Sequence, residues 1–187
     1  MISIADIELL FARHGANQYS GEPVTQLEHA LQTAHFAEQS GADDELVTAC
    51  LLHDLGHLLN DQGETPSLRG IDDTHQYYAL PFLRGLFTDM VLESIRLHVD
   101  AKRYLCRANA DYYARLSDDS KRSLQLQGGI FDVEQAAAFI ALPGAHNAVA
   151  LRLWDDLAKQ AELATPSLAH FLDRAKRCAL VDSPLRQ

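Results

Sequence analysis

The chain has 187 residues, a formal net charge of −10, 47% hydrophobic residues and 7% aromatic residues. That length suits one domain with a substantial buried core, and the low aromatic content favours packed helices over a sheet sandwich. The negative charge repels phosphate backbones, so nucleic acid is not expected as a partner.

The sequence also bears on where the protein works. Its N-terminus has no basic leader followed by an apolar core, and no apolar run approaches membrane-spanning length. Its three cysteines, Cys50, Cys106 and Cys178, are odd in number and widely spaced, which is typical of reduced packing residues rather than of a disulfide framework. We expect a cytoplasmic protein that does not bind membranes, and the sequence does not indicate its oligomeric state.

Helical periodicity begins near the N-terminus. It predicts a short helix over residues 2–14 that ends near Gly15. A loop with Tyr19 and Glu22 follows, and it leads to Thr25-Gln26-Leu27-Glu28, a capping box that predicts the start of a long helix.

That long helix carries His29 and is expected to end at Gly41. Asp43 or Asp44 can cap the next helix. The apolar pattern of this second helix continues without a break into Leu51-Leu52-His53-Asp54-Leu55-Gly56-His57, which we call the HD segment.

Residues 60–71 are rich in Asn, Asp, Gly, Pro and Ser, so they predict a surface loop after the HD segment. Asp72 or Asp73 can then cap a helix that carries His75. Pro81 must bend or divide that helix, because proline lacks a backbone donor and clashes one turn back.

The second half of the chain is also helical. Thr88 caps a strongly periodic helix that carries His98 and, one turn later, Lys102. Further helices are predicted at about 109–116, 118–126, 132–141, 144–161 and 167–180. Strand signals are nearly absent and no repeat is evident, so we predict an all-α fold with a single compact domain over residues 1–187.

The HD segment places two polar side chains that are costly to bury, His53 and Asp54, side by side in an apolar run. On a continuous helix His53 and His57 share one face, and Asp54 lies about a quarter-turn away. An ionised aspartate in apolar surroundings is costly unless it is paired or binds a cation, and a carboxylate that bridges two metals satisfies both oxygens. The segment therefore predicts a metal site.

Other predicted helices supply further ligands. The candidate metal ligands are His29, His53, Asp54, His75, His98 and Asp155. Apart from the adjacent pair they come from separate helices, which is how a helical bundle assembles a metal site. Six ligands with one bridging carboxylate are enough for two metals, and imidazole with carboxylate suits iron, manganese or zinc. By spacing alone, Asp156 could take the place of Asp155.

The remaining histidines have a plainer interpretation. His14, His35, His146 and His170 are interpreted as surface residues or hydrogen-bonded core residues and are left out of the site. The residues alone also favour a solvated surface cation at Lys102 and a polar helix face at Ser120, Ser123 and Gln127.

The ligand pattern resembles that of the HD-domain superfamily, whose His…His-Asp…Asp set falls here on His29, His53-Asp54 and Asp155. Members of that superfamily are all-α metalloproteins, and most are metal-dependent phosphohydrolases. This resemblance implies a hydrolase as the default function, acting on a small phosphate ester or nucleotide.

A narrower resemblance points to a different chemistry. Residues 19–32, residues 40–43 and the HD segment are similar to the PhnZ-type organophosphonate oxygenases, small HD-domain enzymes that use a mixed-valent Fe(II)/Fe(III) pair and O2 to cleave a carbon–phosphorus bond. The similarity runs from about residue 17 to residue 160. It includes Ser120-x-x-Ser123 and Leu126-Gln127-Gly128-Gly129, which resemble that family's phosphonate-binding helix.

The resemblance implies roles for single residues. One iron would be held by His29, His53, Asp54 and Asp155, and the other by Asp54, His75 and His98, with Asp54 as the bridge. Tyr19 and Glu22 would form a gate at the open iron position and, with His57, count as the catalytic residues. The substrate would be bound by Tyr19, His57, Lys102, Ser120, Ser123 and Gln127.

The resemblance also implies a substrate and products. The substrate would be 1-hydroxy-2-(trimethylammonio)ethylphosphonate or 1-hydroxy-2-aminoethylphosphonate, oxidised by O2 to phosphate and glycine betaine or glycine. A primary ammonium needs hydrogen-bond acceptors, whereas a quaternary ammonium prefers aromatic faces, and the six tyrosines offer such faces; overall likeness favours the trimethylated substrate. Two alternatives stay open, a metal-dependent phosphohydrolase on the same scaffold and a metal-free signalling module.

Overall fold

The computed structural model of the chain describes residues 2–19, 21–60, 66–72 and 74–180. Asp73 and part of the predicted loop 60–71 lie outside the described residues. The helices in chain order are α1 (Ile4–His14), α2 (Gln26–Gln39), α3 (Asp44–Leu52), α4 (Leu55–Leu59), the 3-10 turn η1 (Pro66–Arg69), α5 (His75–Tyr78), α6 (Leu80–Leu83), α7 (Asp89–Ala108), α8 (Tyr112–Arg115), α9 (Asp118–Leu126), α10 (Val133–Ile140), α11 (Ala145–Leu157) and α12 (Leu168–Cys178). The described residues contain two isolated β-bridges and no strand. The all-α prediction is therefore confirmed.

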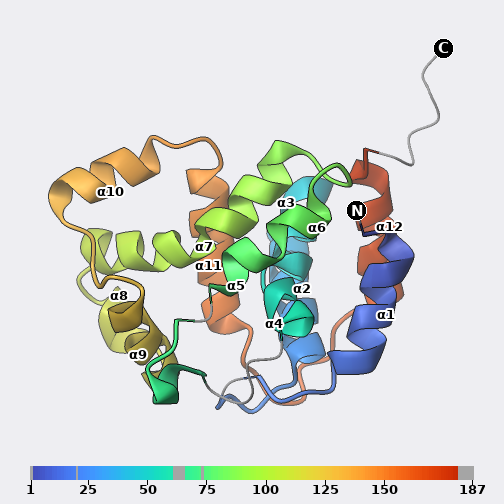
Figure 1. Cartoon of the computed structure of the whole chain (residues 1–187), viewed down its shortest axis with the longest axis horizontal. Helices are drawn as coiled ribbons and strands as arrows, with labels where there is room; N and C mark the ends of the chain where they lie inside the picture. The colour runs from blue at the N-terminus through green and yellow to red at the C-terminus, as the bar shows by residue number, and fades with distance from the viewer. Residues whose placement is uncertain (1, 20, 61–65, 73, 181–187) are drawn as a thin grey trace.

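The helices are arranged around a central group formed by α2, α3, α7 and α11. Helix α3 packs against α2 and α7, and α11 packs against both α7 and α2. Helices α1 and α12 cover one end of the molecule, and α8, α9 and α10 form the other end (Figure 1). Residues on the central helices therefore face one another across the middle of the bundle.

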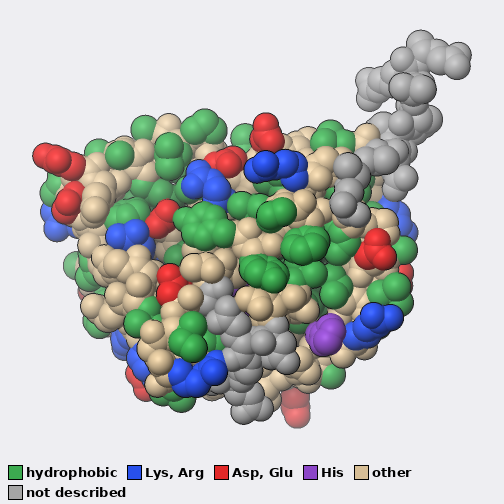
Figure 2. Space-filling model, viewed as in Figure 1, with side chains coloured by type: hydrophobic (Ala, Val, Ile, Leu, Met, Phe, Trp, Pro, Cys, Tyr) green, Lys and Arg blue, Asp and Glu red, His purple; other side chains and the backbone are tan. Residues whose placement is uncertain are grey.

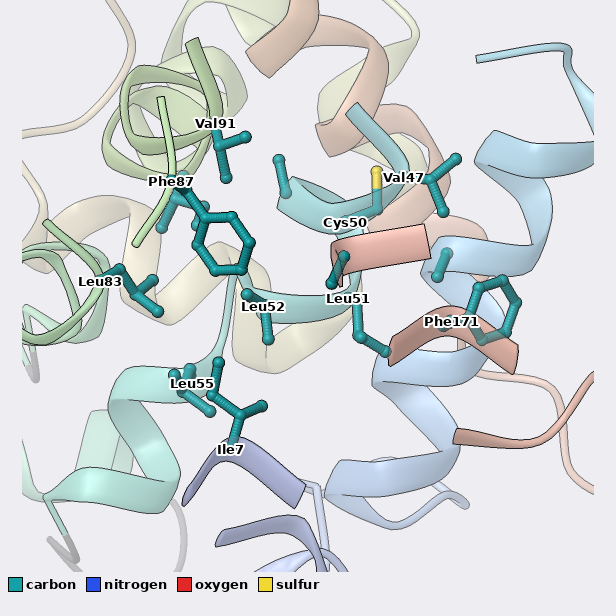
Figure 3. Packing of buried hydrophobic residues seen from close by; sticks show 14 of the residues in the cluster. Ile7, Val47, Cys50, Leu51, Leu52, Leu55, Leu83, Phe87, Val91 and Phe171 are labelled. Carbon is teal, nitrogen blue, oxygen red and sulfur yellow. The ribbon is translucent and has the colours of Figure 1, made fainter. Parts of the chain in front are cut away.

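The largest hydrophobic cluster surrounds α3. All residues from Leu46 to Leu52 are buried, because this helix is apolar on every side and other helices cover it. Figure 3 shows Leu51 and Leu52 among side chains from distant parts of the chain, including Ile7 and Phe171. The residues that follow Leu52 consequently begin at the centre of the molecule.

The HD segment is not one continuous helix, so that prediction was wrong. Helix α3 ends at Leu52 and α4 begins at Leu55, with Asp54 at φ −102° and ψ 13°, outside the helical region. Successive side chains on a continuous helix diverge by about 100°. The break lets the adjacent His53 and Asp54 side chains belong to the same cluster of ligand atoms.

Most of the predicted helix starts are confirmed. The Thr25 and Glu28 capping box is formed at the start of α2. Asp43, not Asp44, caps α3, and its side chain accepts from Leu46 N–H. Thr88 is the N-cap residue of α7, but its hydroxyl donates to Glu45 on α3 instead of capping the helix.

The start of α5 differs from the prediction. Thr74 is the N-cap residue, and Asp72 instead accepts a hydrogen bond from Thr74 N–H over 3.4 Å. Pro81 divides the predicted helix into α5 and α6, as expected. The helix that carries His75 therefore has only four residues.

Two of the predicted later helices are shorter in the structure. Helix α8 covers only Tyr112–Arg115, and α11 ends at Leu157, where the sequence predicted helix to residue 161. Ala158 has left the helical region because its carbonyl turns inward to accept from the buried His29 ring. The three cysteines are free thiols, two of them buried, as the sequence predicted.

The surface charge and the helix lengths are relevant to binding of nucleic acid and of membranes. In the view of Figure 2, acidic and basic side chains are interspersed and form no single basic patch. No single described helix is long and apolar enough to cross a membrane, and α10 and α11 pass that test only as a pair bent by 105°.

Candidate metal centre

The six candidate ligands meet in the middle of the bundle. Two groups of ligand atoms form there, each within 4.8 Å: the first contains His29, His53 and Asp54, and the second contains Asp54, His75 and His98. Asp155 lies next to the first group, with Oδ1 3.3 Å from His29 Nε2. Asp54 is the member that the two groups share.

Each carboxylate oxygen of Asp54 faces a different pair of imidazoles. Oδ2 lies 3.6 Å from His29 Nε2 and 3.4 Å from His53 Nε2. Oδ1 lies 3.2 Å from His75 Nε2 and 3.7 Å from His98 Nε2. The carboxylate is thus oriented to give one oxygen to each of two metal ions.

The imidazoles are oriented for metal binding. His29, His53 and His98 each place Nδ1 2.7–2.8 Å from a backbone carbonyl oxygen, so Nδ1 carries the proton and Nε2 carries a lone pair. The Nε2 atoms of His29 and His53 are only 3.2 Å apart. Two lone pairs at this separation repel each other unless a cation contacts both, and about 3 Å is the spacing of neighbouring ligand atoms that each lie about 2.1 Å from one metal.

The second imidazole pair has a similar spacing. The Nε2 atoms of His75 and His98 are 3.0 Å apart. His98 belongs to the long helix α7 and is 1% exposed. The donor set of both groups therefore fits a pair of metal ions that accept imidazole and carboxylate ligands.

Asp155, and not Asp156, points into the centre. Its Oδ1 is buried and has no hydrogen-bond donor among the described residues, while Oδ2 lies 2.8 Å from Arg152 Nη1. Asp156 is turned away, where it accepts from the Tyr112 hydroxyl. A buried carboxylate oxygen without a donor is costly, and a metal ion would satisfy it.

Burial and neighbouring charges favour the metal-binding protonation states of four ligands. Burial, together with neighbouring imidazoles, lowers the pKa of His98 well below its usual range, and burial also lowers the pKa of His53. Burial would raise the pKa of Asp54 and Asp155. The histidines, and at Asp155 first the Arg152 guanidinium, outweigh it and lower both pKa values well below the usual range. These shifts favour neutral imidazoles at His53 and His98 and ionised carboxylates at Asp54 and Asp155.

His75 owes its position to a close backbone contact with the HD segment. A Cβ atom added at Gly56 would lie 2.1 Å from the His75 carbonyl oxygen, so only glycine permits this approach of α4 and α5. The residue before His75, Thr74, is at φ 48°, a left-handed conformation that is rare for a β-branched residue. His75 also stacks on His57, with ring centroids 4.2 Å apart.

A cavity opens on one side of the centre. Its lining includes Tyr19, Asp54, His57, His75, His98, Lys102, Ser120, Ser123, Gln127 and Asp155. Lys102 is 2% exposed, and its Nζ donates to Ser123 Oγ over 2.8 Å. Burial, followed by the charge of Arg152, lowers the pKa of Lys102 to about 7. Lys102 is therefore not the solvated surface cation that the residues alone favoured.

The end of α9 is fixed beside this cavity. Gly128 has φ +97°, and the carbonyls of Gly128 and Gly129 accept from the Arg103 guanidinium over 3.3 and 2.9 Å. Gln127 directly precedes this turn, and its Oε1 is buried with no donor among the described residues. The cavity is therefore lined both by an unused acceptor, Gln127 Oε1, and by the buried amine of Lys102.

Comparison with known proteins identifies the family. A family model for the HD domain matches residues 27–135, more than half of the chain. The chain belongs to the HD-domain family. Two relatives within it are a hydroxymethylphosphonate dioxygenase from Gimesia maris, 45% identical over 90% of this chain and 84% of its own length, and a [1-hydroxy-2-(trimethylamino)ethyl]phosphonate dioxygenase (glycine-betaine-forming) from Leisingera caerulea, 39% identical over 90% and 86%. A protein of unknown function from Acanthamoeba polyphaga mimivirus is 32% identical over 80% of this chain and 69% of its own length.

In this HD domain the loop before α2 lies against the ligands. The Tyr19 ring stacks on His29, with centroids 3.9 Å apart and planes 13° apart. Burial and the negative charges of Asp54 and Asp155 raise the pKa of Tyr19 well above its usual value, so its hydroxyl stays protonated. The Glu22 carboxylate, the other residue of the predicted gate, does not line the cavity and is paired with Lys159 over 3.1 Å.

Sequence reasoning missed several residues that the HD domain places at or beside the cavity. Arg152 is buried and lines the cavity. Ser67 and Asp119, which are only partly buried, line it as well and hydrogen-bond to each other. The signal for Arg152 was present, because an arginine three and four residues before two aspartates on a largely apolar helix pairs with both of them. Ser67 and Lys159 carry no such local pattern, since their partners lie far away in the sequence.

Proposed function

We propose that this HD-domain chain is an O2-dependent oxygenase that cleaves the carbon–phosphorus bond of a 1-hydroxyphosphonate. The products would be phosphate and a carboxylic acid: glycine betaine from 1-hydroxy-2-(trimethylammonio)ethylphosphonate or glycine from 1-hydroxy-2-aminoethylphosphonate. One observation carries the proposal: two ligand groups that share Asp54 border the cavity that holds a buried lysine. The names of two relatives, both phosphonate dioxygenases, support it.

The proposed metals are two iron ions, held as the mixed-valent Fe(II)/Fe(III) pair. His29, His53, Asp54 and Asp155 would hold one, and Asp54, His75 and His98 the other. The imidazole and carboxylate donors suit iron, and the described residues place no cysteine among them. When bound, the two ions would supply the redox chemistry that activates O2.

The phosphonate is proposed to lie against Lys102 and α9. The Lys102 amine and the hydroxyls of Ser120 and Ser123 can donate to phosphonate oxygens, as can the Gln127 amide nitrogen. Lys102 already points at Ser123 Oγ, so the donors converge before any ligand arrives. A dianion next to Lys102 would also favour its protonated form.

His57 and Tyr19 are proposed to act on the reacting side of the cavity. His57 Nε2 is 3.9 Å from Asp54 Oδ1, and its ring is held by the stack on His75, so it can hold a proton beside the substrate. The Tyr19 hydroxyl keeps its proton and can donate one hydrogen bond. In this arrangement Glu22 can serve as the gate only after its ion pair with Lys159 opens.

The substituent on the hydroxyl-bearing carbon is the feature that a substrate panel should vary. The cavity lining includes the carboxylates of Asp72 and Asp119, which suit a cationic substituent. Tyr19 is the one aromatic residue among the described lining residues, so a full aromatic cage for a quaternary ammonium is not formed by them. A panel with trimethylated, primary-amine and unsubstituted hydroxymethyl phosphonates covers these cases.

The deciding experiment is an aerobic assay of the purified, iron-loaded protein against that panel. Phosphorus NMR would follow phosphate release and an oxygen electrode would follow O2 consumption in the same samples. We expect one phosphate for each O2 consumed with at least one 1-hydroxyphosphonate, and no turnover without O2. Lys102→Met should lower turnover at subsaturating substrate, while Lys121→Met on the outer side of α9 is the matched control.

The competing function on this scaffold is a metal-dependent phosphohydrolase. Such an enzyme would release phosphate from a phosphate ester without O2 and with zinc or manganese in place of iron. Anaerobic release of this kind, together with no O2 consumption on the phosphonate panel, would contradict the proposal. A protein with no affinity for any divalent metal would exclude both functions.

The remaining expectations concern the whole chain. We propose that residues 1–187 form one HD domain, because α1 and α12, which lie outside the matched region, contribute Ile7 and Phe171 to the same core cluster. We also propose that it works in the cytoplasm on a small organophosphonate, with neither nucleic acid nor membrane as a partner. Gel filtration with light scattering would give its oligomeric state.

A further inference from the structure

We propose that Arg152 is a positioning residue that makes Asp155 a ligand through one oxygen only. Arg152 Nη1 lies 2.8 Å from Asp155 Oδ2, and both side chains are almost completely buried. The other oxygen, Oδ1, is the one near His29 and has no donor among the described residues. The guanidinium thus occupies one oxygen of the carboxylate and leaves the other for the metal.

The guanidinium is itself fixed from its other side. Its Nη2 donates to Asp156 Oδ1, and its Nε lies 3.3 Å from Asp156 Oδ2 and 3.2 Å from the Tyr112 hydroxyl. The Tyr112 hydroxyl donates to Asp156 in turn. Arg152 is therefore held between two carboxylates on its own helix and a tyrosine on α8, which fixes the plane of its donors.

Charge gives Arg152 a second effect on the same ligand. Two ionised carboxylates, Asp54 and Asp155, lie in the centre, and an uncompensated buried charge is costly. The buried Arg152 guanidinium lies beside Asp155 and compensates part of that charge. The neighbours of metal ligands typically change metal affinity by about 10–100-fold when they are replaced.

Metal binding measured without substrate separates this role from substrate binding. Arg152 also lines the cavity, so a contact with the phosphonate is the competing explanation for any loss of activity. A substrate contact would raise KM and leave metal binding unchanged. A positioning role would weaken metal binding in the absence of substrate, at one of the two metal positions.

The test is a Co(II) titration of the metal-free, full-length protein, followed by visible absorption and by metal analysis after gel filtration. We expect the wild-type protein to retain two equivalents. Arg152→Lys, which keeps the charge but loses the planar fork, should retain one equivalent tightly and bind the second at least about tenfold more weakly. The visible spectrum should also change, because Asp155 would be free to bind through both oxygens.

Arg174→Lys is the matched control. Arg174 also joins two carboxylates, those of Glu38 and Asp44, but it belongs to α12, contacts the end of α2 and the start of α3, and does not line the cavity. This variant should keep both equivalents at wild-type affinity and change only the unfolding temperature. Asp156→Asn keeps Arg152 but removes one anchor, and it should weaken the same single equivalent by a smaller factor, about two- to fivefold.

Three results would overturn the proposal. They are wild-type affinity for both equivalents in Arg152→Lys, equal weakening of both equivalents, and unchanged metal binding with a raised KM alone. If Arg152→Lys does not fold, the Co(II) titration of Asp156→Asn takes its place. Wild-type affinity for both equivalents in Asp156→Asn would also overturn the proposal. The titration needs no oxygenase turnover, so a failed phosphonate assay and a failed role for Arg152 are separate outcomes.

Discussion

The two halves of the metal centre are built differently. His29 and His53 are fully buried, and a backbone carbonyl orients each ring. His75 is partly exposed and belongs to a four-residue helix that begins after a left-handed Thr74. One half is fixed by the core of the bundle, and the other depends in part on a short segment.

The cavity borders these halves unequally. Both imidazoles of one half, His75 and His98, line it, whereas the other half lines it through Asp155 and not through His29 or His53. A ligand in the cavity therefore meets both imidazoles of the half that contains the less constrained histidine, but only a carboxylate of the other half. We infer that the metal position at His29 and His53 is held firmly, and we call it the firm half. The position at His75 and His98 can adjust when substrate binds, and we call it the adjustable half.

Asp54 belongs to both halves of the metal centre, so its loss should remove metal from both of them. We expect Asp54→Ala to retain neither metal and to lose activity by more than about three orders of magnitude, equivalent to about 4 kcal/mol. Metal analysis of protein purified in the presence of iron measures the first effect, and the oxygen assay measures the second. Asp173→Ala on the exposed face of α12 is the control. Retention of one full equivalent by Asp54→Ala would show that Asp54 is not the bridge.

Gly56→Ala should damage only the adjustable half. The new Cβ would meet backbone atoms of His75 at 2.1–2.9 Å, so α5 must move and carry the imidazole away from His98. We expect one metal equivalent to remain tight and the other to weaken by about 10–100-fold, measured by Fe(II) titration under anaerobic conditions. Gly41→Ala is the matched control, because that glycine also resists substitution, at φ +78°, but has nothing within 4 Å of its Cβ position. Equal loss of both equivalents in Gly56→Ala would mean that the halves are not independent.

The pH dependence of KM tests the role of Lys102 in the cavity next to the adjustable half. Its pKa is about 7 in the free protein, so the amine loses its proton as the pH rises through 7 and the attraction for a phosphonate dianion falls. KM for the phosphonate should therefore rise between pH 6.5 and 8.5, by up to about tenfold for each pH unit above the pKa. Lys102→Arg keeps its charge over this range and should remove that part of the rise. A pH profile of KM that is the same in Lys102→Arg and in the wild type would assign the titration to another group.

The sequence predicted most of the helix starts and the division at Pro81, but it did not predict the break inside the HD segment. Caps such as Thr25 with Glu28 depend on neighbours three residues away, so local pattern is sufficient to locate them. The break after Leu52 arises because distant helices surround His53 and Asp54, and no local signal separates it from a continuous apolar helix. Local rules therefore gave the all-α fold but not the conformation of the HD segment.

In the candidate site, too, some features were predictable from the sequence and others depend on distant contacts. Its ligand types and their shared aspartate were predicted from the residues and from resemblance to a family. The burial of Lys102 and the pairing of Glu22 with Lys159 were not, because each depends on contacts between elements that are 21 to 137 residues apart. The choice of Asp155 over Asp156 was left open by spacing, and the direction of each carboxylate in the structure decides it.

The smallest expected effect is on stability, at the end of the bundle where ion pairs join α12 to the start of α3. Arg177 first, and then Arg174, lower the pKa of Asp44 to about 2, against an ordinary value near 3.8. A depressed carboxylate pKa adds stability that is fully present above about pH 4 and is lost as the pH falls towards 2. Because Asp44 and Arg177 are partly exposed and solvent screens their attraction, we expect Asp44→Asn to cost about 1 kcal/mol or less in the free energy of unfolding at pH 7, and the difference from wild type to shrink below pH 4. Urea unfolding at several pH values measures it, with Arg177→Gln as a second variant that should reproduce the trend. Neither variant should change metal content at pH 7, and a loss of metal in either would mean that this end of the bundle is coupled to the centre.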